Sequence, residues 1–285
     1  MRALPVLSVA DAVTVRYQPR NDRRKLFENL HGRIDSPRAT GIIEQMLRTK
    51  PASLLLRSAT ALTLLLPISA QAATVAIDIG HSLSKPGALS ARGRDEFQFN
   101  RDLARRIADA LLERGIAVRL INANGDIDRL TDRPRQARDV DLFLSIHHDS
   151  MQAHFLASWD RDGTETPYGD RYAGHSLFIS RENPRLKQSL ACASAIGRQM
   201  RDAGFTPTTH HAEKIPGENR PFADEPNGVH YFDHLAVLRH AHVPGVLFEA
   251  GVIVNRAEEL LLLDPERQTR MAQAIARGIE ACLRN

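Results

Sequence analysis

The 285-residue sequence holds only two cysteines, no internal repeat, no low-complexity tract and no apolar run long enough to span a bilayer comfortably. Two cysteines are too few for a small scaffold stapled by several disulfides. The apolar run from Ser58 to Ile68 is shorter than the roughly 20 residues that a transmembrane helix needs. An apolar content of 42% is instead enough for the core of one sizeable domain or two small ones.

Basic residues are not in excess outside the N-terminal segment. The first 72 residues hold 11 Lys and Arg against 5 Asp and Glu, whereas the remaining residues hold 27 against 29. The alkaline isoelectric point therefore reflects the N-terminal segment alone, and the sequence predicts no nucleic-acid partner.

That N-terminal segment has the order of a secretory signal peptide. Arg48 and Lys50 precede the apolar run, and Ala70-Gln71-Ala72 fits a small-x-small cleavage site. We expect residues 46–72 to be a cleaved signal peptide and residues 1–45 to be an upstream extension that is either disordered or not translated. The mature protein is then residues 73–285, exported to the periplasm and without a stable membrane span. The alternative is a cytoplasmic protein with an uncleaved N-terminal anchor.

The two cysteines, Cys192 and Cys282, both lie in apolar, helical surroundings. An oxidising compartment permits a disulfide between them. The pattern favours two small buried hydrophobic residues, and neither has the setting of a nucleophile.

Strands and helices alternate along residues 73–285. The expected strands are Thr74 to Ile79, Ala117 to Ile121, Leu142 to Ile146, His175 to Ser180, Leu235 to Arg239 and Gly245 to Ala250, and the expected helices are Asp95 to Arg114, Leu130 to Arg138, Leu186 to Ala203 and Pro265 to Leu283. This alternation predicts a single α/β domain with a mostly parallel, twisted sheet of about six strands and helices on both faces. Two long polar segments, residues 151–173 and 206–234, are expected to be loops that frame a cleft.

Polar residues follow three of these apolar strands. His81 follows the first strand, His147 ends "FLSIHHDS", and Glu249 lies in "GVLFEAG". Ligands of open α/β sheets bind beyond the carboxyl ends of the strands. Each residue alone is more often a satisfied core or rim residue, but three at one edge favour a site.

Glu96 is a fourth candidate, at the start of the first long helix. An acidic residue in a first helical turn is favoured by the helix dipole in any case. A functional role requires the loop through Gly80, Gly87 and Gly93 to fold back over the sheet edge. Two imidazoles and one carboxylate, with a fourth position open, would form a hydrolase-type zinc site.

These motifs resemble the zinc-dependent N-acetylmuramoyl-L-alanine amidases of the amidase 3 type. The similarity runs over nearly all of Val75 to Leu263. It rests on the glycine-histidine after the first strand, the glutamate fifteen residues later, the "SIH" strand, and "PGVLFEAGVIVN", from Pro244 to Asn255, preceded by "LAVLR". The sequence departs from the family at Ile79 and Ser82, and "GVIVN" replaces an aromatic-containing version of the last motif.

The resemblance implies one zinc ion per chain, held by His81, Glu96 and His147, with Glu249 as the catalytic residue. It implies hydrolysis of the amide bond between N-acetylmuramic acid and the L-alanine of the peptidoglycan stem peptide. Peptidoglycan or its muropeptides are then the partners, together with a possible protein activator. His148 occupies a position where the family has a small residue, so we expect it to support the ligands or line the cleft.

Two other functions remain open. In these alternatives the protein is either a zinc peptidase or amidase that acts on another cell-wall peptide bond, or a non-catalytic wall-binding protein of the same fold. Among the remaining polar residues, His210, His211 and His230 are expected to be solvated, although one of them could contact substrate. His240 and His242 flank a turn and are expected to be structural. Arg220 fits a peptide carboxylate as well as it fits a solvated surface.

Overall fold

The computed structural model describes residues 72–284. The predicted signal peptide and upstream extension lie outside these residues, except for Ala72 at the end of the signal peptide. No helix within residues 72–284 combines the length and apolarity needed to cross a membrane.

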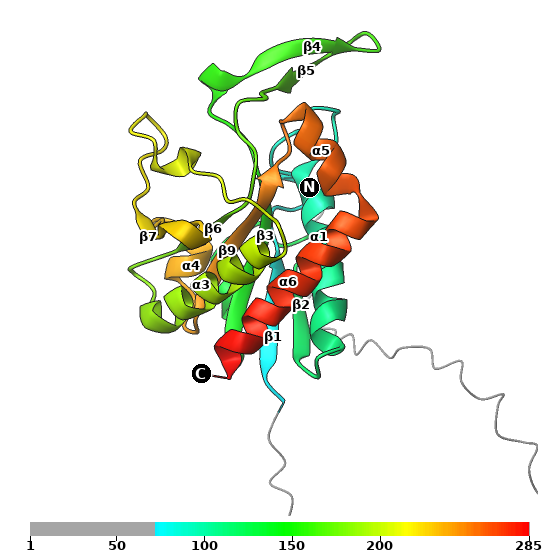
Figure 1. The fold of residues 1–285 in the computed structure, drawn as a ribbon. Coiled ribbons are helices and arrows are strands. Elements are labelled where there is room, and N and C mark those ends of the chain that lie inside the picture. The colour runs from blue at the N-terminus through cyan, green and yellow to red at the C-terminus, as the bar shows by residue number, and fades with distance from the viewer. Residues whose placement is uncertain (1–71, 285) are drawn as a thin grey trace, which may run out of the picture. The chain divides into compact units, whose positions relative to one another are not determined.

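A seven-stranded sheet forms the centre of the domain, in the order β2-β1-β3-β9-β6-β8-β7 (Figure 1). The strands of this sheet are β1 (Thr74–Ile79), β2 (Ala117–Ile121), β3 (Leu142–Asp149), β6 (Ser176–Ile179), β7 (Phe222–Asp224), β8 (Val229–Tyr231) and β9 (Gly245–Val252). Strands β2, β1, β3 and β9 are parallel to one another, while β6 is antiparallel to β9 and β7 is antiparallel to β8. The predicted α/β domain with a mostly parallel sheet is confirmed, with seven strands in place of about six.

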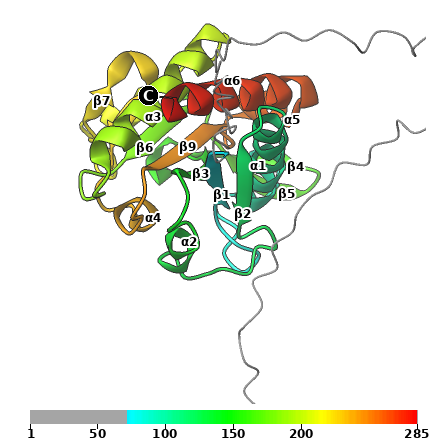
Figure 2. The same ribbon diagram turned by 90° about the horizontal axis from the view of Figure 1, so that it is seen from below.

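Helices cover both faces of the sheet. Their bounds are α1 (Glu96–Leu112), α2 (Asp132–Arg135), α3 (Leu186–Asp202), α4 (Ala236–Arg239), α5 (Arg256–Leu263) and α6 (Pro265–Leu283), with short 3₁₀ helices η1 (Ala153–Phe155), η2 (His210–Ala212) and η3 (Glu225–Asn227). Figure 2 shows α1, α3 and α6 on one side of the sheet and α2 and α4 on the other. The larger part of the core lies between the sheet and α1, α3 and α6.

The local sequence explains the packing of α1 and the start of α6. Along α1, the buried Phe99, Leu103 and Ile107 form the expected apolar stripe. The side chain of Asp264 accepts a hydrogen bond from the backbone of Arg267, and Pro265 takes the first position of α6. These residue types fix the start of α6 independently of its packing.

The structure corrects three expectations about the elements. Leu235 to Arg239 does not form a strand, because residues Ala236–Arg239 form the short helix α4. The segment 151–173 is not a plain loop, since it contains η1 and the antiparallel hairpin of β4 (Ala157–Arg161) and β5 (Thr164–Tyr168). The segment 206–234 likewise contains η2, β7, η3 and β8. Figure 1 shows the β4–β5 hairpin standing beyond the end of the central sheet.

The two cysteines are joined. A disulfide links Cys192 of α3 to Cys282 of α6, with a Cα–Cα distance of 4.9 Å. The favoured interpretation, two unpaired buried residues, is therefore wrong. The two cysteines occupy facing positions on packed helices. The sequence does not reveal this proximity, because the cysteines are 90 residues apart.

Candidate metal centre and active site

Three adjacent strands bring the predicted site residues to one edge of the sheet. Strands β1, β3 and β9 are neighbours and parallel, so their carboxyl ends lie together. His81 follows β1, while His147 and Glu249 are register partners on β3 and β9. Register partners in a parallel sheet present their side chains to the same face. The sheet thus gathers residues that are far apart in the sequence.

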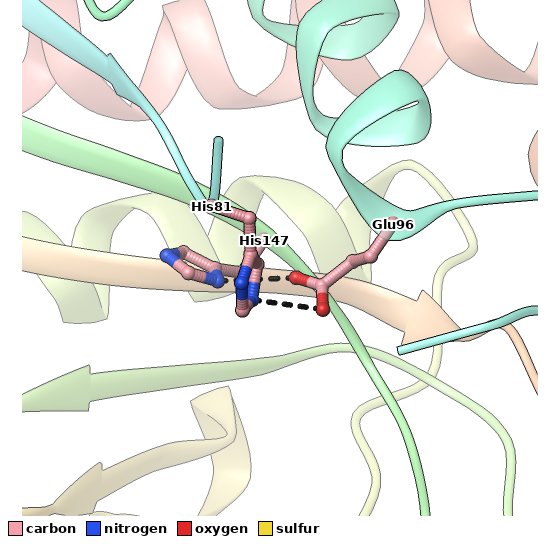
Figure 3. A group of neighbouring side chains, drawn as sticks. All are labelled: His81, Glu96 and His147. Atoms are coloured by element: carbon pink, nitrogen blue, oxygen red, sulfur yellow. Dashed lines mark hydrogen bonds and ion pairs between the residues drawn. The ribbon is translucent and has the colours of Figure 1, made fainter. Parts of the chain in front are cut away.

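Glu96 joins the two histidines from the first turn of α1. One of its carboxylate oxygens lies 2.9 Å from Nε2 of His81, and the other lies 3.1 Å from Nδ1 of His147. Figure 3 shows both imidazoles directed at this carboxylate. One possible ligand atom from each of the three residues lies within 4.8 Å of the others. The structure therefore brings together the three residues that the sequence predicts as metal ligands.

Two glycines in the loop between β1 and α1 allow this approach. A Cβ atom added to Gly80 would lie 2.4 Å from Nε2 of His147, and one added to Gly87 would lie 2.4 Å from a carboxylate oxygen of Glu96. Both separations are shorter than any tolerable contact, and Gly87 also has a φ of +85°. The expected role of these two glycines in folding the loop over the sheet edge is confirmed. Gly93 instead serves a turn, with no atom near its absent side chain.

His81 is held in an unusual backbone conformation. Its φ is +65°, a region that residues other than glycine seldom adopt. Its carbonyl oxygen accepts hydrogen bonds from the side chains of Asn122, at 2.6 Å, and of Arg133. The same two side chains also donate to the carbonyl of Ile79. Sequence reasoning missed both residues, because nothing in the short helix around Arg133 indicates that its buried guanidinium binds the end of β1.

Asn100 and His148 support Glu96 from behind. Asn100 lies one helical turn after Glu96 and donates to its carboxylate at 3.1 Å, and His148 Nδ1 lies 2.8 Å from the Asn100 side-chain oxygen. Burial lowers the pKa of His148 to about 3, although the nearby Glu96 carboxylate opposes the shift. His148 is thus a neutral, buried residue that orients the ligand group, one of the two roles expected for it.

The two glutamates of the site have opposite electrostatic environments. Burial alone would raise the pKa of Glu96, but hydrogen bonds from His147 and His81 hold it well below its ordinary value. Burial, reinforced by Asp149 and Glu96, raises the pKa of Glu249 well above its ordinary value. Within the described part of the chain, Oε2 of Glu249 is buried without a hydrogen-bond partner. Glu249 therefore favours its protonated form, whereas Glu96 favours the ionised form that a metal ligand needs.

A cavity of about 190 Å³ opens beside Glu249. Its lining residues are Asp149, Ser150, Met151, Gln152, Phe178, His211, Glu218, Arg220, Phe232 and Glu249. Arg220 lies close to Glu218 and over the ring of Phe232, at 4.1 Å from the ring centroid. The solvated-surface interpretation of Arg220 is wrong, because its side chain is only 17% exposed.

The prediction that His210, His211 and His230 are solvated is also wrong. All three are buried, with exposed fractions of 2%, 5% and 0%. His210 and His211 belong to η2 and face Asp149 at the end of β3. Together with Asp149 they form a second group of possible metal ligands within residues 72–284. Asp149 precedes the two histidines by 61 and 62 residues in the sequence, so no local motif could reveal this group of three.

The donor set of His81, Glu96 and His147 fits a zinc ion. Two imidazole nitrogens and one carboxylate are the ligand types of hydrolytic zinc sites, which leave a further position for water. The supporting contacts through Asn100, Asn122 and Arg133 match the outer hydrogen bonds that orient ligands at metal sites. A second carboxylate, that of Glu249, lies on the neighbouring strand, and its Oε2 has no hydrogen-bond partner within residues 72–284.

The chain is similar to several known proteins. The protein YqiI of Bacillus subtilis is 27% identical over 212 residues, covering 73% of this chain and 84% of that protein. The N-acetylmuramoyl-L-alanine amidase AmiA of Escherichia coli is 25% identical over 233 residues, covering 72% and 74%. The crystal structure of the amidase Ami1 from Mycobacterium smegmatis has a TM-score of 0.59 at 21% identity, covering 74% of this chain and 96% of that one. A family model described as N-acetylmuramoyl-L-alanine amidase matches residues 75–281, and the chain belongs to that family.

Proposed function

We propose that this amidase is zinc-dependent, with His81, Glu96 and His147 holding the ion and Glu249 moving the proton. A bound zinc ion would polarise the scissile carbonyl and lower the pKa of an attacking water. The observation that carries the proposal is the buried, unpartnered Oε2 of Glu249, presented by the strand next to His147. A buried carboxylate without a partner is costly, which suits a group kept for the reaction.

Glu249 serves both halves of the hydrolysis in this proposal. It accepts a proton from water as the water attacks the amide carbon, and it returns a proton to the nitrogen of the leaving L-alanine. The raised pKa of Glu249 favours retention of that proton between the two steps. The amide bond then breaks, leaving the lactyl carboxylate on the sugar and a free amino terminus on the stem peptide.

The substrate is peptidoglycan, in keeping with the family, and the cavity beside Glu249 supplies a place for part of the stem peptide. The Nε atom of Arg220 is buried without a hydrogen-bond partner in the described residues. We propose that this guanidinium, which Glu218 partly neutralises, binds a carboxylate of the stem peptide.

We further propose that the chain is exported to the periplasm after removal of residues 46–72. Two observations support this, namely the basic, apolar and small-residue order of that segment and the disulfide between Cys192 and Cys282. Dependence on a protein activator remains a prediction. Mass spectrometry of the protein from its native host should find a chain that begins near Ala73, and an intact N-terminus in the periplasm would contradict the export signal.

Digestion of purified peptidoglycan tests the reaction itself. The purified chain should release intact stem peptides with a free L-alanine amino terminus, as identified by mass. Peptides cut at another bond would indicate the zinc peptidase alternative. An absence of any product, with zinc bound and the fold intact, would favour a wall-binding protein.

A further inference from the structure

A second cluster of ligand-type side chains lies at the end of β3, apart from the His81, Glu96 and His147 group. Oδ2 of Asp149 lies 2.8 Å from Nε2 of His211 and 3.3 Å from Nε2 of His210. The imidazoles come from η2, in a segment that folds back over the sheet edge. One ligand atom from each of the three residues lies within 4.8 Å of the others.

Asp149 pairs with both imidazoles at these distances, but the pairs lack the alignment of hydrogen bonds. Oδ2 of Asp149, Nε2 of His210 and Nε2 of His211 are all buried, and none makes an aligned hydrogen bond within residues 72–284. Buried polar atoms in folded proteins nearly always have a partner. A simple ion pair would point an imidazole N–H at the carboxylate. Three convergent atoms that all lack this alignment indicate a common partner between them.

The opposite ring nitrogens are already engaged. Nδ1 of His211 lies 3.0 Å from a carboxylate oxygen of Glu218, and Nδ1 of His210 lies 2.7 Å from the hydroxyl of Thr208. Glu218 is a closer partner of Nδ1 than Arg220, at 3.4 Å, and a proton on Nδ1 donated to this carboxylate leaves Nε2 with a lone pair for a metal ion. Carboxylate–histidine–metal chains of this form are the usual outer support of a metal-binding imidazole.

Packing fixes both imidazoles in place. His210 is stacked on Tyr172, with ring centroids 4.7 Å apart, and His211 packs edge-on against Phe178 at 4.9 Å. A site that holds its ligands before the ion arrives binds it with less loss of side-chain freedom.

The charge of the neighbouring cavity also calls for a cation. Its lining includes the three carboxyl groups of Asp149, Glu218 and Glu249 against the single guanidinium of Arg220. Even with Glu249 protonated, the carboxylates of Asp149 and Glu218 outnumber the single guanidinium, so the cavity favours a cation.

We propose that Asp149, His210 and His211 bind a second divalent cation, of the zinc class, in addition to the single ion that the sequence implies. Asp149 and His211 line the cavity, so the remaining coordination positions of this ion face the space that also contains Glu249. The second ion would anchor η2 to the end of β3 and offer a binding point for a substrate oxygen. This inference does not depend on which peptidoglycan bond is cut.

Metal stoichiometry of the full chain tests the proposal. Protein stripped with a chelator and then equilibrated with zinc in a metal buffer should hold two zinc equivalents by elemental analysis. His210→Ala/His211→Ala should hold one, as should His81→Ala, and the combined variant should hold none. His242→Ala, at an exposed position, is the matched control and should hold two. Cobalt substitution gives a second readout, because each variant should lose a different part of the visible absorption.

The single substitution His211→Gln, with circular dichroism on every sample, guards against loss of the fold, and it should also reduce the count by one. A single zinc equivalent in the wild-type chain, lost in His81→Ala and retained in His210→Ala/His211→Ala, would overturn the second site and leave the proposed amidase chemistry intact. Two equivalents without amide hydrolysis would do the reverse.

Discussion

His147 and Glu249 are register partners on the neighbouring parallel strands β3 and β9. One residue is a proposed ligand and the other is the proposed base, so a single strand register sets their separation. A shift of β9 by one residue would turn Glu249 to the other face of the sheet. The buried apolar runs that fix this register therefore also fix the chemistry.

Replacing Glu249 with glutamine separates catalysis from metal binding. Glutamine keeps the shape and a hydrogen-bonding oxygen but removes the basic function. We expect Glu249→Gln to retain zinc and fold while losing at least about a hundredfold in amidase rate, the lower end of the usual contribution of a general base. Release of stem peptides and zinc content are measured on the same preparation. Near-normal turnover would rule out Glu249 as the base, and loss of zinc would make it a ligand.

Glu96→Ala tests the ligand that the sequence alone supports least. It should sharply weaken zinc binding, because the carboxylate between His81 and His147 is removed. Asp95→Ala is the control, since Asp95 precedes Glu96 at the helix start and its side chain makes no capping hydrogen bond. Competition with a coloured chelator measures the affinity. A Glu96→Ala protein with full zinc and full activity would reduce Glu96 to a residue of the helix start.

Arg133 should act on the metal through the backbone of His81. We expect Arg133→Met to weaken zinc binding by about 10–100-fold, the usual cost of losing an outer hydrogen bond at a metal site. Arg129→Met changes an exposed arginine nearby and should leave the affinity unchanged. Equal zinc affinities in the two variants would show that Asn122 holds the His81 carbonyl unaided.

His175 should make the fold sensitive to acid. Burial lowers its pKa from 6.5 to about 4, and a contact to the backbone of Thr206 offsets only part of this shift. As the pH falls from 6.5 to 4, the unfolded chain takes up a proton that the folded chain does not. The contribution of neutral His175 to the free energy of unfolding is therefore complete above pH 6.5. About 3 kcal/mol of this free energy is lost as the pH falls to 4.

Urea unfolding of wild type and His175→Phe across this pH range measures the effect. The variant keeps an aromatic ring against Phe248 and should show a shallower decline in the free energy of unfolding. His234→Phe, at an exposed histidine, should decline as the wild type does. Parallel curves for wild type and His175→Phe would assign the acid sensitivity to other groups.

The disulfide should contribute measurably to stability. Cys192→Ala/Cys282→Ala should lower the free energy of unfolding by about 2–4 kcal/mol, the usual range for a native disulfide. Reduction of the wild-type protein should lower its Tm towards that of the variant, and the variant should not respond to reductant. A wild-type Tm that is insensitive to full reduction would contradict this expectation.

The sequence predicted the elements whose pattern is long and one-sided. The strands β1, β3 and β9 are apolar runs buried on both faces, and the stripe of α1 repeats over four turns. The strands β7 and β8 have three residues each, too short for any periodicity. The apolar segment Leu235 to Arg239 predicts a strand. In the structure Val237 and Leu238 instead pack on the sheet from a single helical turn.

The residues of the site likewise fall into those that the sequence could predict and those that it could not. His81, Glu96, His147 and Glu249 could be predicted because each follows a recognisable strand or opens a helix. Asn122 and Arg133 could not, because they act on the site through the backbone carbonyl of His81, and such a contact leaves no mark in a sequence. The burial of His210 and His211 depends on the folding of a 29-residue polar segment onto Asp149, a long-range contact without a local signal.

The disulfide between α3 and α6 has a consequence for refolding. Helix α6 packs on both α1 and α3 and carries one half of the disulfide. The disulfide closes a sequence separation of 90 residues, so joining α3 to α6 costs more loop entropy than joining two helices that are neighbours in the sequence. Once formed, the bond keeps these two segments linked in the unfolded chain, which reduces that cost each time the chain refolds.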